Sequence, residues 1–201
     1  MQTALTNRSG PNQVRDQLRS FTSTLPGKLA LGLAATAVIA LAAHISSPLW
    51  FTPVPFTLQP LAVLGVGLAF GPVGGFLTLI AYLAEGACGL PVFSPTGLGG
   101  VAQLLGPTGG YLLAYPLVAA IAGGLSRTLA KRLSLFIAAA LACTAATTLL
   151  FFAGAGWLMA LTHLSLRATW IAAIAPFLPG EAIKILAAAG IYSTLRRPRH
   201  N

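Results

Sequence analysis

The stretch Pro-Phe-Leu-Pro-Gly-Glu-Ala-Ile-Lys, residues 176–184, places two full charges inside a segment otherwise long and apolar enough to span a bilayer. Glu181 and Lys184 stand three residues apart, so on a helix they share one face and can pair or hold a ligand together. Pro179 and Gly180 just ahead of them are typical of a helix start or a kink. Ionisable residues at membrane depth are costly and usually line an interior cavity. We therefore expect a binding site in the first turn of this helix; the alternative is an ion pair that only holds two helices in register.

The composition is that of an integral membrane protein. Of the 201 residues, 56% are hydrophobic and only 7% are charged, and the mean hydropathy is +0.81. A formal net charge of +9 is compatible with nucleic-acid binding, but the basic residues stand in short clusters between apolar spans, which the positive-inside rule explains better. Cys88 and Cys143 lack metal-ligand spacing. We expect no nucleic-acid partner, no metal and no resident cofactor.

Apolar runs separated by short loops predict an all-α integral membrane protein with six transmembrane helices and re-entrant outer loops. The expected spans run over about 29–45, 57–70, 76–87, 107–126, 135–161 and 170–195. One membrane domain therefore covers 29–195, between a polar basic tail at 1–28 and a basic C-terminus at 196–201. Three prolines exclude a regular helix at 46–56, where an interfacial loop is expected.

The segment 86–106 carries six glycines and two prolines after an unusually short third span. Irregular backbone is tolerated at membrane depth only where protein covers it or it lines a cavity. We therefore expect this segment to be a re-entrant lid. Glu85, next to it, is expected to be solvated or paired rather than part of a site.

The distribution of charge predicts the orientation. With six spans, both termini lie on one side, and that side holds ten of the twelve Lys and Arg residues. The other side holds only Arg167, and Lys184 lies within the membrane. By the positive-inside rule we expect a multi-pass protein of the cell membrane with both termini cytoplasmic and a cavity that opens outward.

The first span carries small residues at a spacing of four, which lets another helix approach closely in lipid. They are Ala30, Gly32, Ala34 and Thr36. Two interpretations stay open for this small-residue face. It packs within the protein's own bundle, or it docks a helix of a partner.

Four short sequences carry a family likeness: Val-Pro-Phe-Thr-Leu-Gln (54–59), Gly-Leu-Pro-Val-Phe (89–93), Leu-Gly-Pro-Thr-Gly-Gly-Tyr-Leu (105–112) and Pro-Gly-Glu-x-x-Lys (179–184). Together they resemble the BioY family, the biotin-specific substrate-capture (S) component of energy-coupling factor (ECF) transporters, over roughly 29–195. The resemblance implies a protein that captures biotin from outside and works with a coupling membrane protein and two cytoplasmic ATPases. The chain has no P-loop sequence, so ATP hydrolysis would come from those partners.

In the family, the acidic-x-x-Lys pair at the start of the last helix contributes to the vitamin site, often with Asp where this chain has Glu181. Biotin offers a carboxylate for Lys184, an apolar ring and chain for aromatic side chains, and a ureido group with donors and an acceptor. Glu181 could accept the ureido N–H groups or instead orient Lys184. Gln59 either contacts the ligand or caps its helix. The expected substrate-binding residues are Gln59, Tyr82, Phe93, Gly100, Glu181 and Lys184.

Other function classes are an S component for another vitamin, such as thiamine or riboflavin, a self-sufficient channel or carrier, and an intramembrane enzyme. For an enzyme, Glu85, His163 and Glu181 would have to act together, yet they lie on three different segments. The chain has no Gly-x-Ser-x-Gly sequence. We expect no catalytic residues and no enzyme activity.

Overall fold

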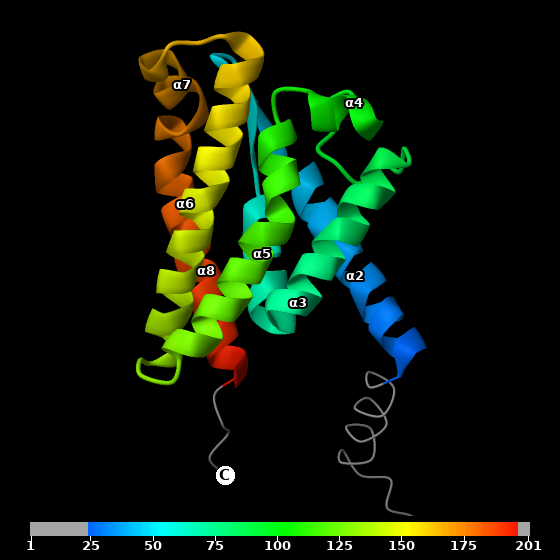
Figure 1. Ribbon diagram of the computed structural model, residues 1–201, viewed down its shortest axis with the longest axis vertical. Helices are drawn as coiled ribbons and strands as arrows, with labels where there is room; N and C mark the ends of the chain where they lie inside the picture. The colour runs from blue at the N-terminus through cyan, green and yellow to red at the C-terminus, as the bar shows by residue number, and fades with distance from the viewer. Residues whose placement is uncertain (1–23, 197–201) are drawn as a thin grey trace, which may run out of the picture. The chain divides into compact units, whose positions relative to one another are not determined.

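The computed structural model describes residues 24–196 (Figure 1). The chain divides into two units, residues 1–35 and residues 36–201. Most of the predicted tail and C-terminus lies outside the described residues. Within these residues, five helical segments are long and apolar enough to cross a membrane: α2 (Leu25–His44), α3 (Gln59–Ala87), α5 (Gly109–Leu129), α6 (Leu135–Thr162) and Leu166–Arg196. Helix α2 begins four residues before the predicted span, so Lys28 is helical.

Helix α3 consists of two arms that fold back on each other at Gly71. Gly71 has φ 80° and ψ −174°, a conformation available mainly to glycine. On a straight helix Gln59 and Tyr82 would stand about 34 Å apart, yet Nε2 of Gln59 donates to Oη of Tyr82 at 2.8 Å. The arms are therefore antiparallel, and the described residues hold six membrane-embedded helical segments. The two predicted spans are confirmed, and a tight turn at Gly71 separates them.

Each arm of α3 is shorter than a bilayer's apolar core. At 1.5 Å per residue the arms measure roughly 18 and 24 Å, against a core of about 30 Å. The chain beyond the arms is therefore needed to complete the membrane-embedded body. It supplies a β-hairpin before the first arm and the predicted lid after the second.

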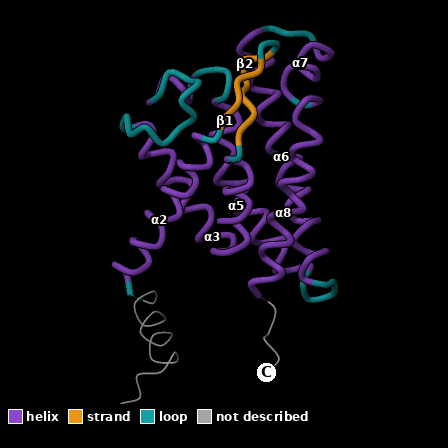
Figure 2. The backbone as a smooth tube through the Cα atoms, turned by 180° about the vertical axis from the view of Figure 1, so that it is seen from behind, coloured by secondary structure: helices purple, strands orange, loops and turns teal. Residues whose placement is uncertain are grey.

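The hairpin replaces the interfacial loop expected at 46–56. Strand β1 (Ser46–Leu49) pairs antiparallel with β2 (Thr52–Thr57), as Figure 2 shows. Proline lacks an N–H and is therefore confined to edge strands. In a two-stranded sheet every strand has a free edge, so both strands can contain proline. Oγ1 of Thr52 donates to the carbonyl of Ala172 at 2.7 Å, which ties the hairpin to helix α7.

The last predicted span is three elements rather than one. They are α7 (Leu166–Ala173), the 3-10 turn η1 (Ala175–Phe177) and α8 (Leu178–Arg196). Proline is readily accommodated in the first turn of a helix, where its missing N–H leaves no bond unmade, and α8 begins with Leu-Pro-Gly. The predicted helix start ahead of Glu181 is confirmed, because Glu181 lies in the first turn of α8.

The second unit has two distinct ends. The β-hairpin, α7 and the short helix α4 (Gly100–Leu105) gather at one end, the hairpin end (Figures 1 and 2). The Gly71 turn, the α5–α6 turn and the C-terminal end of α8 lie at the other, the turn end. Helix α4 falls inside the predicted lid, where no helix was expected.

Candidate functional site

A pocket lies where β2, the first arm of α3, the lid, α5, α6, η1 and α8 meet. The space between its lining atoms is about 570 Å³, which includes the open solvent at its mouth. The polar lining comprises Thr57, Gln59, Ser94, Gln103, Thr108, Tyr111, Tyr115, Glu181 and Lys184. The apolar lining comprises Val54, Pro55, Pro60, Leu112, Leu150, Phe151 and Phe177. Polar side chains that converge on one space beside apolar ones are typical of a ligand site.

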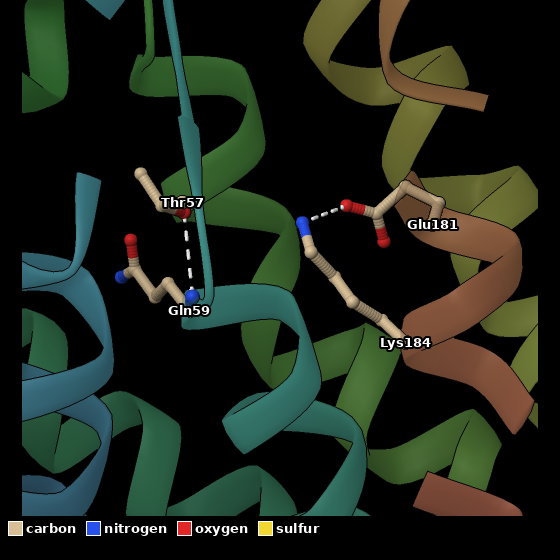
Figure 3. A network of polar contacts seen from close by, with 4 residues as sticks. All are labelled: Thr57, Gln59, Glu181 and Lys184. Atoms are coloured by element: carbon tan, nitrogen blue, oxygen red, sulfur yellow. Dashed lines mark hydrogen bonds and ion pairs between the residues drawn. The ribbon is translucent and has the colours of Figure 1, made fainter. Parts of the chain in front are cut away.

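The two charges of the opening sequence form a buried ion pair on this pocket (Figure 3). Nζ of Lys184 donates to Oε1 of Glu181 at 2.6 Å, and the two residues are 4% and 5% exposed. The ammonium also lies 4.2 Å from the ring centroid of Phe56, a cation–π contact. An ammonium has three donors, so Lys184 can keep these contacts and still donate to a ligand.

Phe56 reaches Lys184 because residue 180 is a glycine. A Cβ at Gly180 would collide with Cε2 and Cζ of the Phe56 ring. The ring also stacks on Phe177, with centroids 6.4 Å apart and an interplanar angle of 6°. Two of the four sequences with the family likeness, 54–59 and 179–184, are therefore in direct contact at the site.

Gln59, Tyr82 and Phe93 form a connected group, of which only Gln59 lines the pocket. Oη of Tyr82 accepts from Nε2 of Gln59 at 2.8 Å and donates to the carbonyl of Val92 at 2.7 Å. The Phe93 ring packs edge-on against Tyr82, with centroids 5.5 Å apart. The backbone N–H of Gln59 donates to Oγ1 of Thr57 (Figure 3). Tyr82 and Phe93 thus lie outside the pocket lining, where they orient the amide of Gln59 and hold the lid.

The lid reaches the pocket through Gln103 and Ser94 rather than through Gly100, which is absent from the lining. Oε1 of Gln103 accepts from the N–H of Gly99 at 3.1 Å, and its Nε2 donates to the carbonyl of Ser94 at 3.3 Å. Gln103 therefore closes the turn at 94–99 and faces the pocket at the same time. Sequence reasoning did not single it out, because nothing local distinguishes an amide in a glycine-rich loop.

Two further lining residues, Thr108 and Tyr111, belong to a sequence quoted above only as a family likeness, 105–112. Oη of Tyr111 donates to the carbonyl of Ala173 at 2.7 Å, which links α5 to the end of α7. The family likeness at 105–112 was the sequence signal that pointed to both residues. Which side chains of this segment face a ligand depends on the rotation of α5 about its axis, and the sequence alone does not determine that rotation.

The small-residue face of α2 divides between the two units. Thr36 is 2% exposed and donates to Oε1 of Glu85 at 3.0 Å, so it faces its own chain. The same bond supplies the pairing expected for Glu85. Ala30, Gly32 and Ala34 lie in the unit of residues 1–35.

A buried cation on a partly apolar pocket, within helices long enough to cross a membrane, defines a membrane protein that binds a small molecule. The model of the BioY family matches residues 14–201. The chain belongs to the BioY family, and it is a multi-pass membrane protein.

Individual relatives agree with this assignment. A protein of Pyrococcus horikoshii described as a probable biotin transporter BioY is 35% identical over 144 residues, which are 72% of this chain and 82% of the relative. A protein of Bacillus subtilis with the same description is 38% identical over 69 residues, 34% of this chain and 37% of the relative. A crystal structure described as the S-component for biotin from an ECF-type ABC transporter superposes with a TM-score of 0.77 at 26% identity, over 94% of this chain and 95% of that chain.

Proposed function

We propose that this chain is the membrane subunit that binds biotin for uptake by an ECF-type transporter. The observation that carries the proposal is Lys184, a buried cation that lines the pocket at the position of the family's acidic-x-x-Lys sequence. A cation in this setting selects a ligand with a strong acceptor. The biotin transporters and the biotin S-component to which the chain is similar supply the identity of that ligand.

Biotin has strong acceptors at both ends, its carboxylate and its ureido carbonyl. Lys184 donates to one of them, while Glu181 holds the ammonium in place or accepts from the ureido N–H groups. Gln59, Ser94 and Gln103 offer further polar contacts from the pocket wall. The aromatic and aliphatic lining covers the fused ring and the chain of the vitamin.

The orientation follows from the basic residues. Arg127, Lys131 and Arg132 lie near the α5–α6 turn, and Arg196 ends α8, all at the turn end. At the hairpin end the described cation is Arg167 in α7. The positive-inside rule then makes the turn end and both termini cytoplasmic. The lid and the hairpin face the outside, from which biotin enters.

Energy comes from partners in this proposal. The sequence has no P-loop. Because the chain is similar to a biotin S-component of an ECF-type ABC transporter, we infer that two cytoplasmic ATPases act on this subunit through a coupling membrane protein. The chain itself binds and presents biotin and catalyses no reaction.

Calorimetry with the purified chain in detergent tests the proposal. We expect saturable biotin binding and no binding of thiamine or riboflavin. Lys184→Ala should weaken biotin binding by about 1.5–3 kcal/mol, the value of a hydrogen bond to a charged group. Lys131→Ala, an exposed cation in the α5–α6 turn, is the control and should bind like the parent. Unchanged affinity in a folded Lys184→Ala variant, or binding of another vitamin instead, would refute the proposal.

Biotin amide, which lacks the charge, identifies the end that meets Lys184. If the carboxylate contacts Lys184, the amide binds the parent more weakly than biotin does, and the difference disappears in Lys184→Ala. If the ureido group contacts Lys184, the same difference persists in the variant.

A further inference from the structure

Three tyrosines lie at or beside the pocket, and their hydroxyls differ in their hydrogen bonds. Oη of Tyr82 accepts one hydrogen bond and donates another, and Oη of Tyr111 donates to the carbonyl of Ala173. The hydroxyl of Tyr115 makes no hydrogen bond within residues 24–196, although Tyr115 is only 4% exposed. A buried tyrosine hydroxyl usually has a partner. The partner of Tyr115 is therefore to be sought outside the chain.

The hydroxyl of Tyr115 opens on the pocket. Among the described residues, the side-chain oxygens that have neither a partner nor accessible surface are Oγ1 of Thr147 and Oε2 of Glu181. Oη of Tyr115 is not one of them, so this unpartnered oxygen keeps accessible surface. Because Tyr115 lines the pocket, that surface is available to a ligand there.

Helix α5 presents one face to the pocket, and Tyr115 belongs to it. The lining residues Thr108, Tyr111, Leu112 and Tyr115 stand at the spacing i, i+3, i+4 and i+7, which is a single helix face. The bond from Tyr111 to the end of α7 holds this face in place. Tyr115 lies one helical turn, about 5.4 Å, further from the start of α5 than Tyr111. Its hydroxyl is thus a fixed polar group inside the pocket.

We propose that the hydroxyl of Tyr115 donates a hydrogen bond to an oxygen of the bound vitamin, as a second donor beside the ammonium of Lys184. This inference rests on the proposed function and deepens it. Biotin offers more accepting oxygens than N–H groups, and Glu181 and the amide oxygen of Gln59 can accept from those N–H groups. A further donor is therefore the group that this ligand requires from the pocket wall.

Two donors from different helices also make the pocket selective. Lys184 projects from α8 and Tyr115 from α5, so a ligand must place acceptors against both. A few fixed polar groups set the orientation of a ligand in a partly apolar pocket. A ligand without an acceptor at Tyr115 leaves the hydroxyl unpaired in a site from which it has displaced water, and its affinity is lower.

Tyr115→Phe removes the hydroxyl and keeps the ring. Titration calorimetry of the full chain in detergent should show a biotin affinity about three- to tenfold lower than that of the parent, the value of one hydrogen bond. Tyr192→Phe is the matched control, because Tyr192 is 8% exposed, lies outside the pocket lining and likewise makes no hydrogen bond within residues 24–196. It should bind like the parent. Equal affinities of Tyr115→Phe and the parent would overturn the proposal.

Thermal unfolding without biotin separates a ligand contact from a structural one. Tyr115→Phe should unfold at the temperature of the parent or above it, because the hydroxyl has no partner in the described part of the chain. Tyr111→Phe should unfold at a lower temperature, because it loses the bond to the carbonyl of Ala173. A lower unfolding temperature of Tyr115→Phe would mean that the hydroxyl supports the fold, which contradicts the proposal.

Two analogues identify the accepting oxygen. Biotin amide lacks the charged carboxylate, and iminobiotin carries a nitrogen in place of the ureido oxygen. The affinity loss caused by Tyr115→Phe should be smaller for one of these analogues than for biotin, and that analogue lacks the oxygen that accepts. An equal loss for biotin and both analogues would refute a hydrogen bond to either oxygen. A parent chain that does not bind biotin refutes the proposed function as well, whereas equal affinities of the parent and Tyr115→Phe refute only this inference.

Discussion

The ammonium of Lys184 is held from two directions, by the carboxylate of Glu181 at 2.6 Å and by the ring of Phe56 at 4.2 Å. The ring holds its place because it stacks on Phe177 and because Gly180 leaves room for it. A methyl group added at residue 180 would therefore displace the Phe56 ring and disturb its contact with Lys184, without touching Lys184 itself.

Gly180→Ala should weaken biotin binding, because Phe56 must move away from Lys184 to make room for the methyl group. The extra methyl group in a packed site should also lower the folding stability by about 1–3 kcal/mol. The matched control is Gly190→Ala in the same helix, where a Cβ has no heavy atom within 4 Å. That control should keep its affinity, and alanine's helix propensity should stabilise it by up to about 1 kcal/mol. Titration calorimetry of both variants is the measurement, and equal affinities would contradict the role of Phe56.

How far the site can be predicted from the sequence depends on the separation of the residues involved. Glu181 and Lys184 stand one helical turn apart, so their contact follows from helix geometry alone. Phe56 and Gly180 stand 124 residues apart in the sequence (180 − 56), and their contact depends on how the β-hairpin packs against α8. The hydroxyl of Tyr82 holds Gln59 and the lid, an arrangement that depends on the fold-back of α3. The contact of Tyr82 with a ligand stays a prediction.

Among the elements, the lid is held by a small number of side-chain hydrogen bonds. Tyr82 binds the carbonyl of Val92, Gln103 closes the turn at 94–99, and Nε1 of Trp157 donates to the carbonyl of Gly106 at 2.9 Å. A segment with few anchors opens at low free-energy cost. The lid is therefore the element best suited to admit a ligand to the pocket.

Hydrogen exchange in detergent should show that biotin protects the amides of residues 94–105, because ligand contacts with Ser94 and Gln103 stabilise the closed lid. The middle of α5, at 112–122, is the internal reference and should exchange equally with and without biotin. Gln103→Ala should raise the exchange of the lid in the absence of ligand. Identical exchange of the lid in both states of the parent would mean that the segment is a fixed plug.

The long helices were predictable, and the irregular elements were not, for a physical reason. Hydropathy over a window of about 19 residues identifies a span by its length, which suffices for α5 and α6. The same window merges α7, η1 and α8, because the break at 174–177 is apolar. The strands of the hairpin carry three prolines, and whether these disrupt a strand depends on which edge faces the partner strand.

At the scale of the whole molecule, the proposed function requires a surface on which the energised partner docks. We infer that helix α2 supplies this surface. On an α-helix, residues 30, 34 and 38 share one face, and residues 32 and 36 lie on nearly the opposite one. Thr36 is buried against Glu85, whereas Val38 is 55% exposed. Of the two small-residue rows, the one with Ala30 and Ala34 is therefore the row we infer to dock a partner helix.

Ala34→Trp should abolish energised biotin uptake and co-purification with the coupling membrane protein, because close approach between helices in lipid requires small side chains. Biotin binding to the isolated subunit should stay intact, since Ala34 is outside the pocket lining. Ile183→Trp, an equally large side chain on the exposed face of α8, is the control and should leave uptake unchanged. Loss of biotin binding in Ala34→Trp would mean that this row packs within the protein's own bundle. Unchanged uptake and binding would place the partner contact on another surface, because a bulky ring in a tight helix–helix contact cannot be accommodated without separating the two helices.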